Sequence, residues 1–205
     1  MTENTFMGAV YELDSADKTR EFYDEWSRSY DRELAENGYA TPARIAAALA
    51  KFVSDKTVPI LDIGCGTGVS GAALRAEGFT TIDGSDFSAE MLAEARAKGI
   101  YRQLMQADAS QPMPVENGAY GAITAVGVFS PGHAGPETID AVMAKLPSGG
   151  LFAFSLNDHA LKIPGYGGRI MDHLDSGSAS LLFREYGPHL PKIGLNASVH
   201  VMRKS

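Results

Sequence analysis

Short apolar runs alternate with helical patterns along most of the chain. Seven runs predict strands, over 58–63, 79–87, about 101–107, 120–129, 151–156, 179–186 and 196–203. The periodicity of the segments between them predicts helices over about 69–77, 88–98, 136–146 and 167–175. Strands that alternate with helices are typical of βαβ units in a parallel sheet. The run 120–129 is the most continuously apolar and is therefore expected at the centre of that sheet.

The two ends of the chain depart from this alternation. The last two strand runs are joined by too little chain for a helical crossover, so they are expected to form an antiparallel hairpin at the sheet edge. The glycine-rich stretch 165–168 is interpreted as part of a loop and as a candidate lid. Before residue 58 the pattern is wholly helical. One helix is expected over 19–30, with aromatic residues on one face, and a second over 43–53.

The composition is that of a folded globular protein. Of the 205 residues, 44% are hydrophobic and 21% are charged, which excludes wholesale disorder and a fibrous repeat. The length fits one α/β domain with an N-terminal extension, so we expect a helical segment over 1–57 and a domain over 58–205 that form one structural unit. No stretch approaches the roughly 18 apolar residues of a membrane span, and the first residues lack the features of a signal peptide. We therefore expect a cytoplasmic protein without membrane contact.

Charge and cysteine content narrow the possible partners. The net charge of -7 argues against a nucleic-acid partner, because a surface that binds nucleic acid normally needs clustered Lys and Arg. The single cysteine, Cys65, excludes an intramolecular disulfide and a multi-thiolate zinc site, and no metal site is expected. A small molecule is therefore the first ligand to consider.

A glycine cluster follows the first strand run and precedes a helix. It reads Leu61-Asp-Ile-Gly-Cys-Gly-Thr-Gly68, and glycines at such a turn let a ligand approach the backbone. A dinucleotide fingerprint would need glycine where Val69 stands, and a phosphate P-loop would need a lysine that is absent there. Acidic residues accompany the strand ends: Asp62 precedes the loop, Asp86 ends the second run and Asp108 ends the third. The pattern therefore favours one ligand that spans three strands and is held by carboxylates.

These residues resemble the motifs of the class I S-adenosylmethionine-dependent methyltransferases. The first motif of that family, E/D-x-G-x-G-x-G, is matched in full by residues 62–68. The second motif, a strand that ends in an acidic residue before a Ser-capped helix, corresponds to residues 84–92, and the third corresponds to 106–109. The family's elements after the fourth strand and before the fifth correspond to residues 126–133 and 147–151. The resemblance covers nearly the whole chain.

Within this family the chain is similar to the Williams-Beuren syndrome region methyltransferase-like proteins. The similarity rests on Tyr23-Asp-Glu-Trp-Ser-Arg-Ser-Tyr-Asp31 and on Val126-Gly-Val-Phe-Ser130. The family resemblance implies an α/β fold with a Rossmann-like sheet of seven mostly parallel strands, in the order 3-2-1-4-5-7-6, with the last strand antiparallel. It also implies helices on both faces of the sheet and an N-terminal helical segment that covers the cofactor site.

The resemblance implies S-adenosylmethionine as the cofactor and S-adenosylhomocysteine as its product. Asp62 is expected to orient the glycine loop and to approach the ammonium of the methionine moiety. Asp86 is expected to accept hydrogen bonds from both ribose hydroxyls. Phe87 is expected to pack on the adenine, whose amino group would bind Asp108 beside the backbone of Ala109.

Further contacts are implied around the methionine end of the cofactor. Tyr30 is expected to close over that end, and Gly127 is expected to lie beneath the sulfonium. The remaining cofactor contacts that the family motifs imply are Gly64, Cys65, Gly66, Gly68 and Met91.

The methyl acceptor is not defined by any motif. Transfer from a sulfonium needs an acceptor aligned in line with the methyl group, and a hydroxyl or ammonium acceptor also needs a base. His133 is the first candidate for that base and His159 the second, because both follow strand ends that face the acceptor space. The Asn/Asp-Pro-Pro-Tyr/Phe motif of enzymes that methylate nucleic-acid amines is replaced here by Ser130-Pro-Gly-His133. A small-molecule acceptor is therefore expected.

Three other functions remain open from the sequence. One is a non-catalytic protein that binds S-adenosylmethionine or S-adenosylhomocysteine, because cofactor residues alone do not show turnover. Another is a protein methyltransferase, which would need an acidic rim facing a basic partner. The last is a nicotinamide-dependent dehydrogenase, which would bind NAD in preference to S-adenosylmethionine. The oligomeric state is also open.

Overall fold

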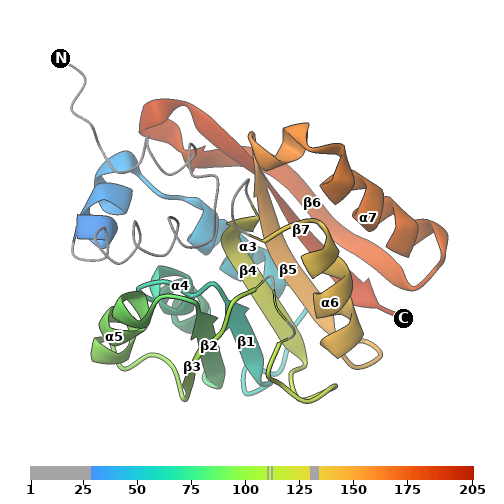
Figure 1. The fold of residues 1–205 in the computed structure, drawn as a ribbon, viewed down its shortest axis with the longest axis horizontal. Helices are drawn as coiled ribbons and strands as arrows, with labels where there is room; N and C mark the ends of the chain where they lie inside the picture. The colour runs from blue at the N-terminus through green and yellow to red at the C-terminus, as the bar shows by residue number, and fades with distance from the viewer. Residues whose placement is uncertain (1–28, 110, 112, 130–133) are drawn as a thin grey trace.

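The computed structural model describes residues 29–109, 111, 113–129 and 134–205 (Figure 1). The strands are β1 (Ile60–Ile63), β2 (Ile82–Asp86), β3 (Leu104–Gln106), β4 (Ala122–Phe129), β5 (Leu151–Asn157), β6 (Ala179–Leu190) and β7 (Leu195–Lys204). The α-helices are α3 (Thr41–Ala50), α4 (Val69–Ala76), α5 (Ala89–Ala97), α6 (Glu137–Lys145) and α7 (Pro164–Asp175), and two short 3-10 helices are η2 (Ala160–Lys162) and η3 (Pro191–Ile193). Residues 29–37 are also helical.

All seven strands form one sheet in the order β3-β2-β1-β4-β5-β7-β6. Strands β1 to β5 pair in parallel, whereas β7 runs antiparallel to both of its neighbours, β5 and β6. The predicted fold class and strand order are therefore confirmed. Because parallel strands end at the same edge, the loops that follow β1, β2 and β4 lie close together, which is where open α/β sheets bind ligands.

Helices cover both faces of the sheet (Figure 1). Successive residues of a strand point to opposite faces, so Phe152 and Phe154 of β5 pack in the core under α6 and α7, and Ala153 packs in the core under α3 and α4. Every residue of β5 is buried. Strand β4, the most continuously apolar run in the sequence, is the central strand of the seven as predicted, and all of its residues except Gly127 are buried.

The N-terminal segment leads into α3 through a tight turn. The helix over 29–37 ends at Gly38, whose φ of 73° is left-handed. The Gly38 N–H donates to the Ala35 carbonyl at 3.1 Å and the Tyr39 N–H to the Leu34 carbonyl at 3.0 Å, which is the Schellman pattern of a helix C-terminus. The next helix then begins two residues later with Pro42 in its first turn.

The C-terminal region differs from the prediction at two places. The predicted hairpin is present, but its strands are longer and extend over Ala179–Leu190 and Leu195–Lys204. The interpretation of the stretch 165–168 as part of a loop is wrong, because these residues form the first turn of α7. Pro164 supplies a helical φ at the start of the helix, and Tyr166 anchors it with 2% exposure and a 2.7 Å hydrogen bond to the Ala134 carbonyl.

Other predicted elements differ only at their ends. The third strand is shorter than predicted, at Leu104–Gln106, and the second N-terminal helix spans Thr41–Ala50. Most of the predicted helix 19–30 lies outside the described residues. Within the described ranges, none of the helices is long and apolar enough to cross a membrane.

Candidate functional site

The glycine loop adopts a conformation that only glycine supports easily. Gly64, Gly66 and Gly68 have φ angles of 63°, 53° and 93°, in the left-handed region that L side chains rarely adopt. A Cβ at Gly64 would lie 2.5 Å from Cγ2 of Val128, so this glycine also allows close packing against β4. A Cβ at Gly66 would meet nothing within 4 Å, so this part of the loop faces open space. The loop therefore presents bare backbone to a ligand.

Asp86 links the end of β2 to this loop. Its Oδ2 accepts a 2.9 Å hydrogen bond from the Gly66 N–H, and its Oδ1 accepts one of 3.0 Å from the Ser88 N–H. The residue is 6% exposed, and burial raises the pKa of its carboxyl to about 6. Ser88 in turn caps α5, because its side chain accepts from the Met91 N–H at 3.1 Å. Asp86 is thus a fixed acceptor at the junction of the loop and α5.

Asp62 lies deeper, behind the start of α4. Its side chain is fully buried and accepts three hydroxyl hydrogen bonds, from Ser70 at 2.5 Å, Tyr101 at 2.8 Å and Thr124 at 2.7 Å. Burial raises the pKa of this carboxyl, and the three hydroxyl donors act in the opposite direction. Asp62 therefore anchors the loop through Ser70. Ser70 would therefore stand between Asp62 and the ligand ammonium that Asp62 is expected to approach.

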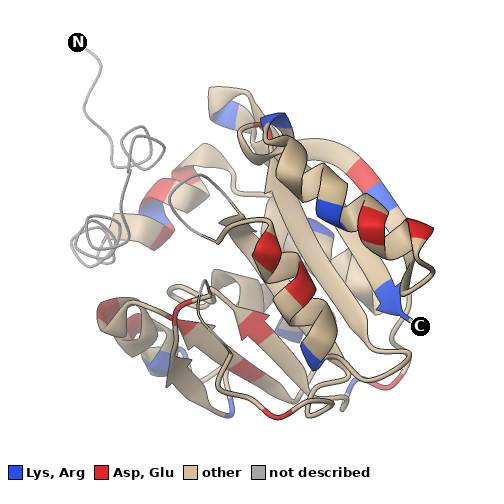
Figure 2. Cartoon of the chain, turned by 45° about the vertical axis from the view of Figure 1, so that its right-hand side comes forward, with Lys and Arg blue, Asp and Glu red and all other residues tan. Residues whose placement is uncertain are grey.

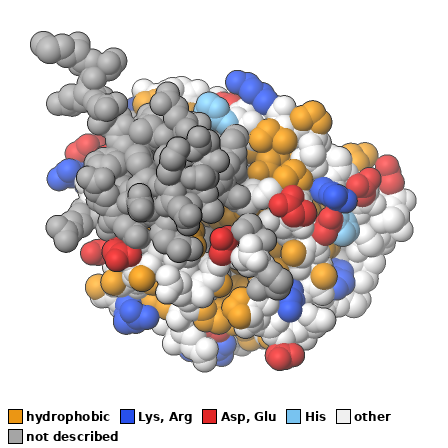
Figure 3. All heavy atoms as spheres, viewed as in Figure 1, with side chains coloured by type: hydrophobic (Ala, Val, Ile, Leu, Met, Phe, Trp, Pro, Cys, Tyr) orange, Lys and Arg blue, Asp and Glu red, His pale blue; other side chains and the backbone are white. Residues whose placement is uncertain are grey.

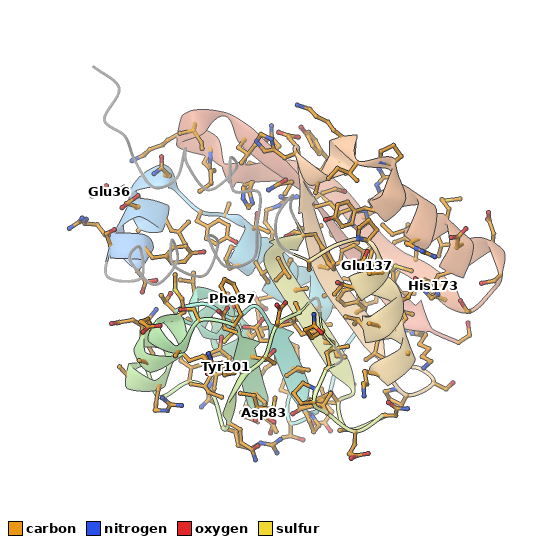
Figure 4. The ribbon with its side chains drawn as sticks, in the orientation of Figure 1. Glu36, Asp83, Phe87, Tyr101, Glu137 and His173 are labelled. Carbon is orange, nitrogen blue, oxygen red and sulfur yellow. The ribbon has the colours of Figure 1, made fainter. Side chains whose placement is uncertain are left out.

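Some of the other predicted contact residues lie in the core, and others are half-buried at the ends of β2 and β3. Cys65 and Met91 are 3% and 1% exposed, so both fill space in the core of the protein, and burial raises the pKa of the Cys65 thiol. Phe87 is half-buried at the carboxyl end of β2 (Figure 4). Asp108 and Ala109 are half-buried just after β3. The Ala107 N–H donates to the Asp86 carbonyl at 2.9 Å, which holds this segment beside β2.

The carboxyl end of β4 carries a bulge at Gly127. The register between β4 and β5 shifts between Ala125 and Phe129, and Gly127 has a φ of 72°. Its N–H donates to the Ser155 hydroxyl at 3.0 Å. A Cβ at Gly127 would lie 2.8 Å from the Tyr39 hydroxyl, so this tyrosine stands directly over the bulge.

Tyr39 was not predicted as a site residue. The turn at Gly38 directs it toward β4, and its ring meets the ring of His189 edge to face, with 5.1 Å between the centroids. Nδ1 of His189 lies 2.7 Å from the Thr41 hydroxyl, and burial lowers the pKa of this histidine to about 4. Tyr39 therefore packs against a His189 ring that is uncharged at neutral pH. Gly38, directly after a helical pattern, is the sequence signal that could have indicated the turn.

The N-terminal helix touches the glycine loop directly. The Thr67 hydroxyl donates to Oδ1 of Asp31, and Lys98 of α5 forms a 2.5 Å ion pair with Oδ2 of the same residue. Asp31 therefore joins the helix over 29–37 to both the loop and α5. Neither contact was predicted, because it depends on how two distant segments fold together.

A small pocket opens where these elements meet. It is lined by Tyr30, Tyr39, Pro42, Gly64, Cys65, Gly66, Thr67, Val69, Ser70 and Val126. The lining thus combines one wall of glycine-loop backbone with an opposite wall from the N-terminal segment. Tyr30, Gly64, Cys65 and Gly66, all predicted from the sequence, come together here.

Of the two histidines predicted as candidate bases, the structure describes His159. His133 lies outside the described residues. His159 is half-buried after β5, and its N–H donates to the Asn157 side chain at 3.1 Å. It therefore lies at the same edge of the sheet as Gly127. Across the described residues, no three His, Cys, Asp or Glu side chains are grouped as metal ligands.

Comparison with known proteins agrees with the architecture and the loop. Residues 60–150, from β1 to the start of β5, match the family described as methyltransferase domain. The fold is that of the class I S-adenosylmethionine-dependent methyltransferases, and residues 60–150 carry the methyltransferase domain. The resemblance predicted from the motifs is therefore confirmed.

Particular relatives can be named. Human methyltransferase-like protein 27 is 34% identical over 131 residues, which are 62% of this chain and 54% of that protein, and it supports the predicted similarity to the Williams-Beuren group. This chain thus spans about half the length of that relative.

Solved structures share the fold at low sequence identity. Magnesium protoporphyrin IX methyltransferase from Synechocystis PCC 6803 with bound S-adenosylmethionine has a TM-score of 0.71 at 18% identity, over 94% of this chain and 98% of that chain. A TehB-like S-adenosylmethionine-dependent methyltransferase from Corynebacterium glutamicum has a TM-score of 0.64 at 20% identity, over 89% of this chain and 98% of that chain.

Proposed function

We propose that this protein transfers the methyl group of S-adenosylmethionine to a small-molecule acceptor. The observation that carries the proposal is the pocket where the glycine loop meets Tyr30 and Tyr39, beside the bulge at Gly127. The loop exposes backbone at Gly66, and the neighbouring Asp86 is a fixed acceptor. These features suit a ligand that joins an amino acid to a ribose. The cofactor, when bound, supplies an electrophilic methyl group on a sulfonium.

The residue roles at the adenosine end follow the family motifs. Asp86 would accept hydrogen bonds from the ribose hydroxyls, and the half-buried Phe87 would pack on the adenine. Asp108 would accept from the adenine amino group beside Ala109. The hydrogen bond between the Ala107 N–H and the Asp86 carbonyl supports these roles, because it keeps the two acidic residues on adjacent strand ends.

The roles at the methionine end depend on both walls of the pocket. The loop backbone of Gly64, Gly66 and Gly68 would line the methionine moiety, and Tyr30 would close over it from the N-terminal segment. Gly127 would lie beneath the sulfonium. Cys65 and Met91, which are buried, would shape the site from the core side. We further propose that the segment 1–57 covers this end of the cofactor, which the ion pair of Asp31 with Lys98 supports.

The pocket wall supplies no charged acid or base for the transfer step. The lining residues include no Asp, Glu, His, Lys or Arg. Proximity and orientation would then supply most of the catalysis. A hydroxyl or ammonium acceptor would lose its proton to His133 or to His159, of which His159 lies just after β5.

The charge distribution supports a small molecule over nucleic acid. The net charge is -7, and the Lys and Arg residues coloured in Figure 2 are distributed over many elements. On the face shown in Figure 3, acidic and basic side chains of the described residues are interspersed. We propose a cytoplasmic location, which the lone cysteine supports.

Acceptor-dependent turnover is the test of this function. The protein is incubated with S-adenosylmethionine and fractions of a small-molecule extract, and S-adenosylhomocysteine is measured. We expect one or more fractions to raise its production at least tenfold above the rate without acceptor.

The absence of a charged residue from the pocket wall also favours a second function, a non-catalytic cofactor-binding protein. Tight binding without turnover in any of these fractions, and without turnover in a separate panel of protein substrates, would support that second function.

Affinity for S-adenosylhomocysteine should depend on the ionisation of Asp86. Burial raises the pKa of this carboxyl to about 6, so the acceptor form predominates above pH 6 and is lost below it. Because the ribose hydroxyls donate to the ionised form, the affinity should fall as the pH drops, by up to about tenfold per pH unit below 6. Titrations between pH 7.5 and 5 measure this.

The control for this pH dependence is Asp86→Asn. The amide does not titrate, so the variant should bind more weakly but with a flat profile over the same pH range. A wild-type protein whose affinity is unchanged between pH 7.5 and 5 would contradict the role given to Asp86.

A further inference from the structure

Tyr101 reaches from the segment before β3 to the buried carboxylate of Asp62. Its hydroxyl donates to Oδ2 of Asp62 at 2.8 Å and accepts a hydrogen bond from the Gly71 N–H at 3.1 Å. It therefore bridges the first strand and the first turn of α4. The family motifs assign no role to this tyrosine.

Three glycines leave the space that the ring of Tyr101 occupies. A Cβ at Gly71 would lie 2.4 Å from the Tyr101 hydroxyl, one at Gly84 would lie 3.0 Å from its Cδ1, and one at Gly68 would lie 3.2 Å from its Cε2. Gly68 belongs to the glycine loop, Gly71 to α4 and Gly84 to β2. Glycines of three separate elements therefore make room for the Tyr101 side chain and define where its hydroxyl lies.

The sheet register explains why this hydroxyl meets Asp62. Asp62 pairs with Gly84 of β2 on one side and with Thr124 of β4 on the other, so all three point to the face that α4 covers. Thr124 reaches the carboxylate from its own strand, whereas Gly84 has no side chain, and Tyr101 enters over it. Tyr101 thus supplies the donor that β2 lacks.

Ser70 connects this buried network to the pocket. It donates to the same Oδ2 of Asp62 that Tyr101 binds, and it also lines the pocket. The Ser70 hydroxyl therefore lies between the Asp62 carboxylate and the pocket. Its charge and orientation affect what that wall attracts, because a charge at short range and low dielectric acts strongly on a cation. The titratable groups that interact electrostatically with Asp62 are Cys65 and Asp86, besides Tyr101.

We propose that Tyr101 is a positioning residue for the methionine end of S-adenosylmethionine, which holds the Asp62 carboxylate behind Ser70 so that the pocket attracts the α-ammonium group. This inference rests on the proposed function. Tyr101 acts through Asp62 and does not itself touch the ligand. Removal of its hydroxyl therefore affects only ligands that carry the ammonium group.

The test compares two ligands on Tyr101→Phe. S-adenosylhomocysteine carries the amino-acid moiety, whereas 5′-methylthioadenosine has the same adenosine and thioether without it. Phe keeps the ring that packs among the glycines and removes the donor to Asp62. We expect the variant to lose about tenfold in affinity for S-adenosylhomocysteine, because a carboxylate held by one donor fewer attracts the ammonium less, and less than about twofold for methylthioadenosine. The loss should increase toward pH 5.5, because Asp62 binds a proton more readily without this donor.

Tyr120→Phe is a matched control within the same chain. The Tyr120 hydroxyl donates at 2.8 Å to Oδ2 of Asp83, a buried carboxylate of β2, but Asp83 pairs with Leu61 and points to the opposite face of the sheet. Figure 4 shows Asp83 and Tyr101 at different heights along the strands, with Phe87 nearer the carboxyl ends. We expect Tyr120→Phe to bind both ligands as the wild type does.

Two outcomes would overturn the inference. Equal losses for both ligands would mean that the hydroxyl only maintains the loop, and no loss for either would mean that it has no role in binding. If Tyr101→Phe does not fold, Thr124→Val carries the same expectation, since it removes the donor to Oδ1 of Asp62. Wild-type protein that binds neither ligand would contradict the proposed function itself, and the inference with it.

Discussion

Replacement of Asp86 by Ala should reduce the affinity for S-adenosylhomocysteine at least about 100-fold. Two hydroxyl hydrogen bonds to a carboxylate are worth roughly 1.5–3 kcal/mol each, and both would be lost. The variant also frees the Gly66 N–H, which Asp86 now holds at 2.9 Å, so the loop that faces the ligand becomes less ordered. Calorimetric titration at pH 7.5 measures the change.

The control is Asp83→Asn in the same strand. Asp83 is also buried, but it pairs with Arg102 at 2.6 Å on the other face of the sheet. We expect Asp83→Asn to lower the stability of the protein and to leave the affinity for S-adenosylhomocysteine unchanged. A folded Asp86→Ala variant that binds as tightly as the wild type would mean that the ligand does not use the end of β2.

Replacement of Gly64 by Ala should destabilise the protein by about 2–5 kcal/mol. A left-handed φ costs an L residue roughly 1–2 kcal/mol, and forcing an extra methyl into a packed site costs roughly 1–3 kcal/mol more. Here φ is 63° and the new Cβ would lie 2.5 Å from Val128. For a chain of this length the melting temperature should fall by roughly 5–15 °C, and ligand binding should be lost as β1 and β4 move apart.

Gly99 offers a closely matched comparison. It has the same φ of 63°, but a Cβ there would meet nothing within 4 Å. Gly99→Ala therefore carries only the backbone cost, about 1–2 kcal/mol, and should bind the ligand normally. Equal melting temperatures for Gly64→Ala and Gly99→Ala would show that the contact with Val128 is not tight.

The positions of the strands and the acidic end of β2 could be predicted because their signals are local, whereas the strand order came from the family resemblance. Asp86 ends an apolar run and is followed by a serine that caps a helix, so the sequence alone placed it at the edge of the sheet. The glycine loop could be predicted for the same reason, since the left-handed conformations of Gly64, Gly66 and Gly68 favour glycine at those positions. Each of these features is decided by a few neighbouring residues.

Contacts between distant segments could not be predicted in this way. Tyr101 was assigned to the third strand because residues 101–107 are partly apolar, yet it precedes β3 and turns toward α4. Tyr39 meets Gly127 only because the turn at Gly38 redirects the chain. No periodicity encodes either contact.

The region 165–168 shows how composition can mislead. Three glycines in four residues favour a loop, but Pro164 starts a helix there and the burial of Tyr166 stabilises it. Tertiary packing thus overrides a poor helix propensity.

The most direct test of the proposed site is a calorimetric titration of the wild-type protein with S-adenosylmethionine, S-adenosylhomocysteine and NAD. We expect one site per chain for the first two ligands, with dissociation constants on the order of 1–100 μM, and no measurable binding of NAD. Binding of NAD in preference to S-adenosylmethionine, or no binding of either S-adenosyl compound, would contradict the assignment of this pocket.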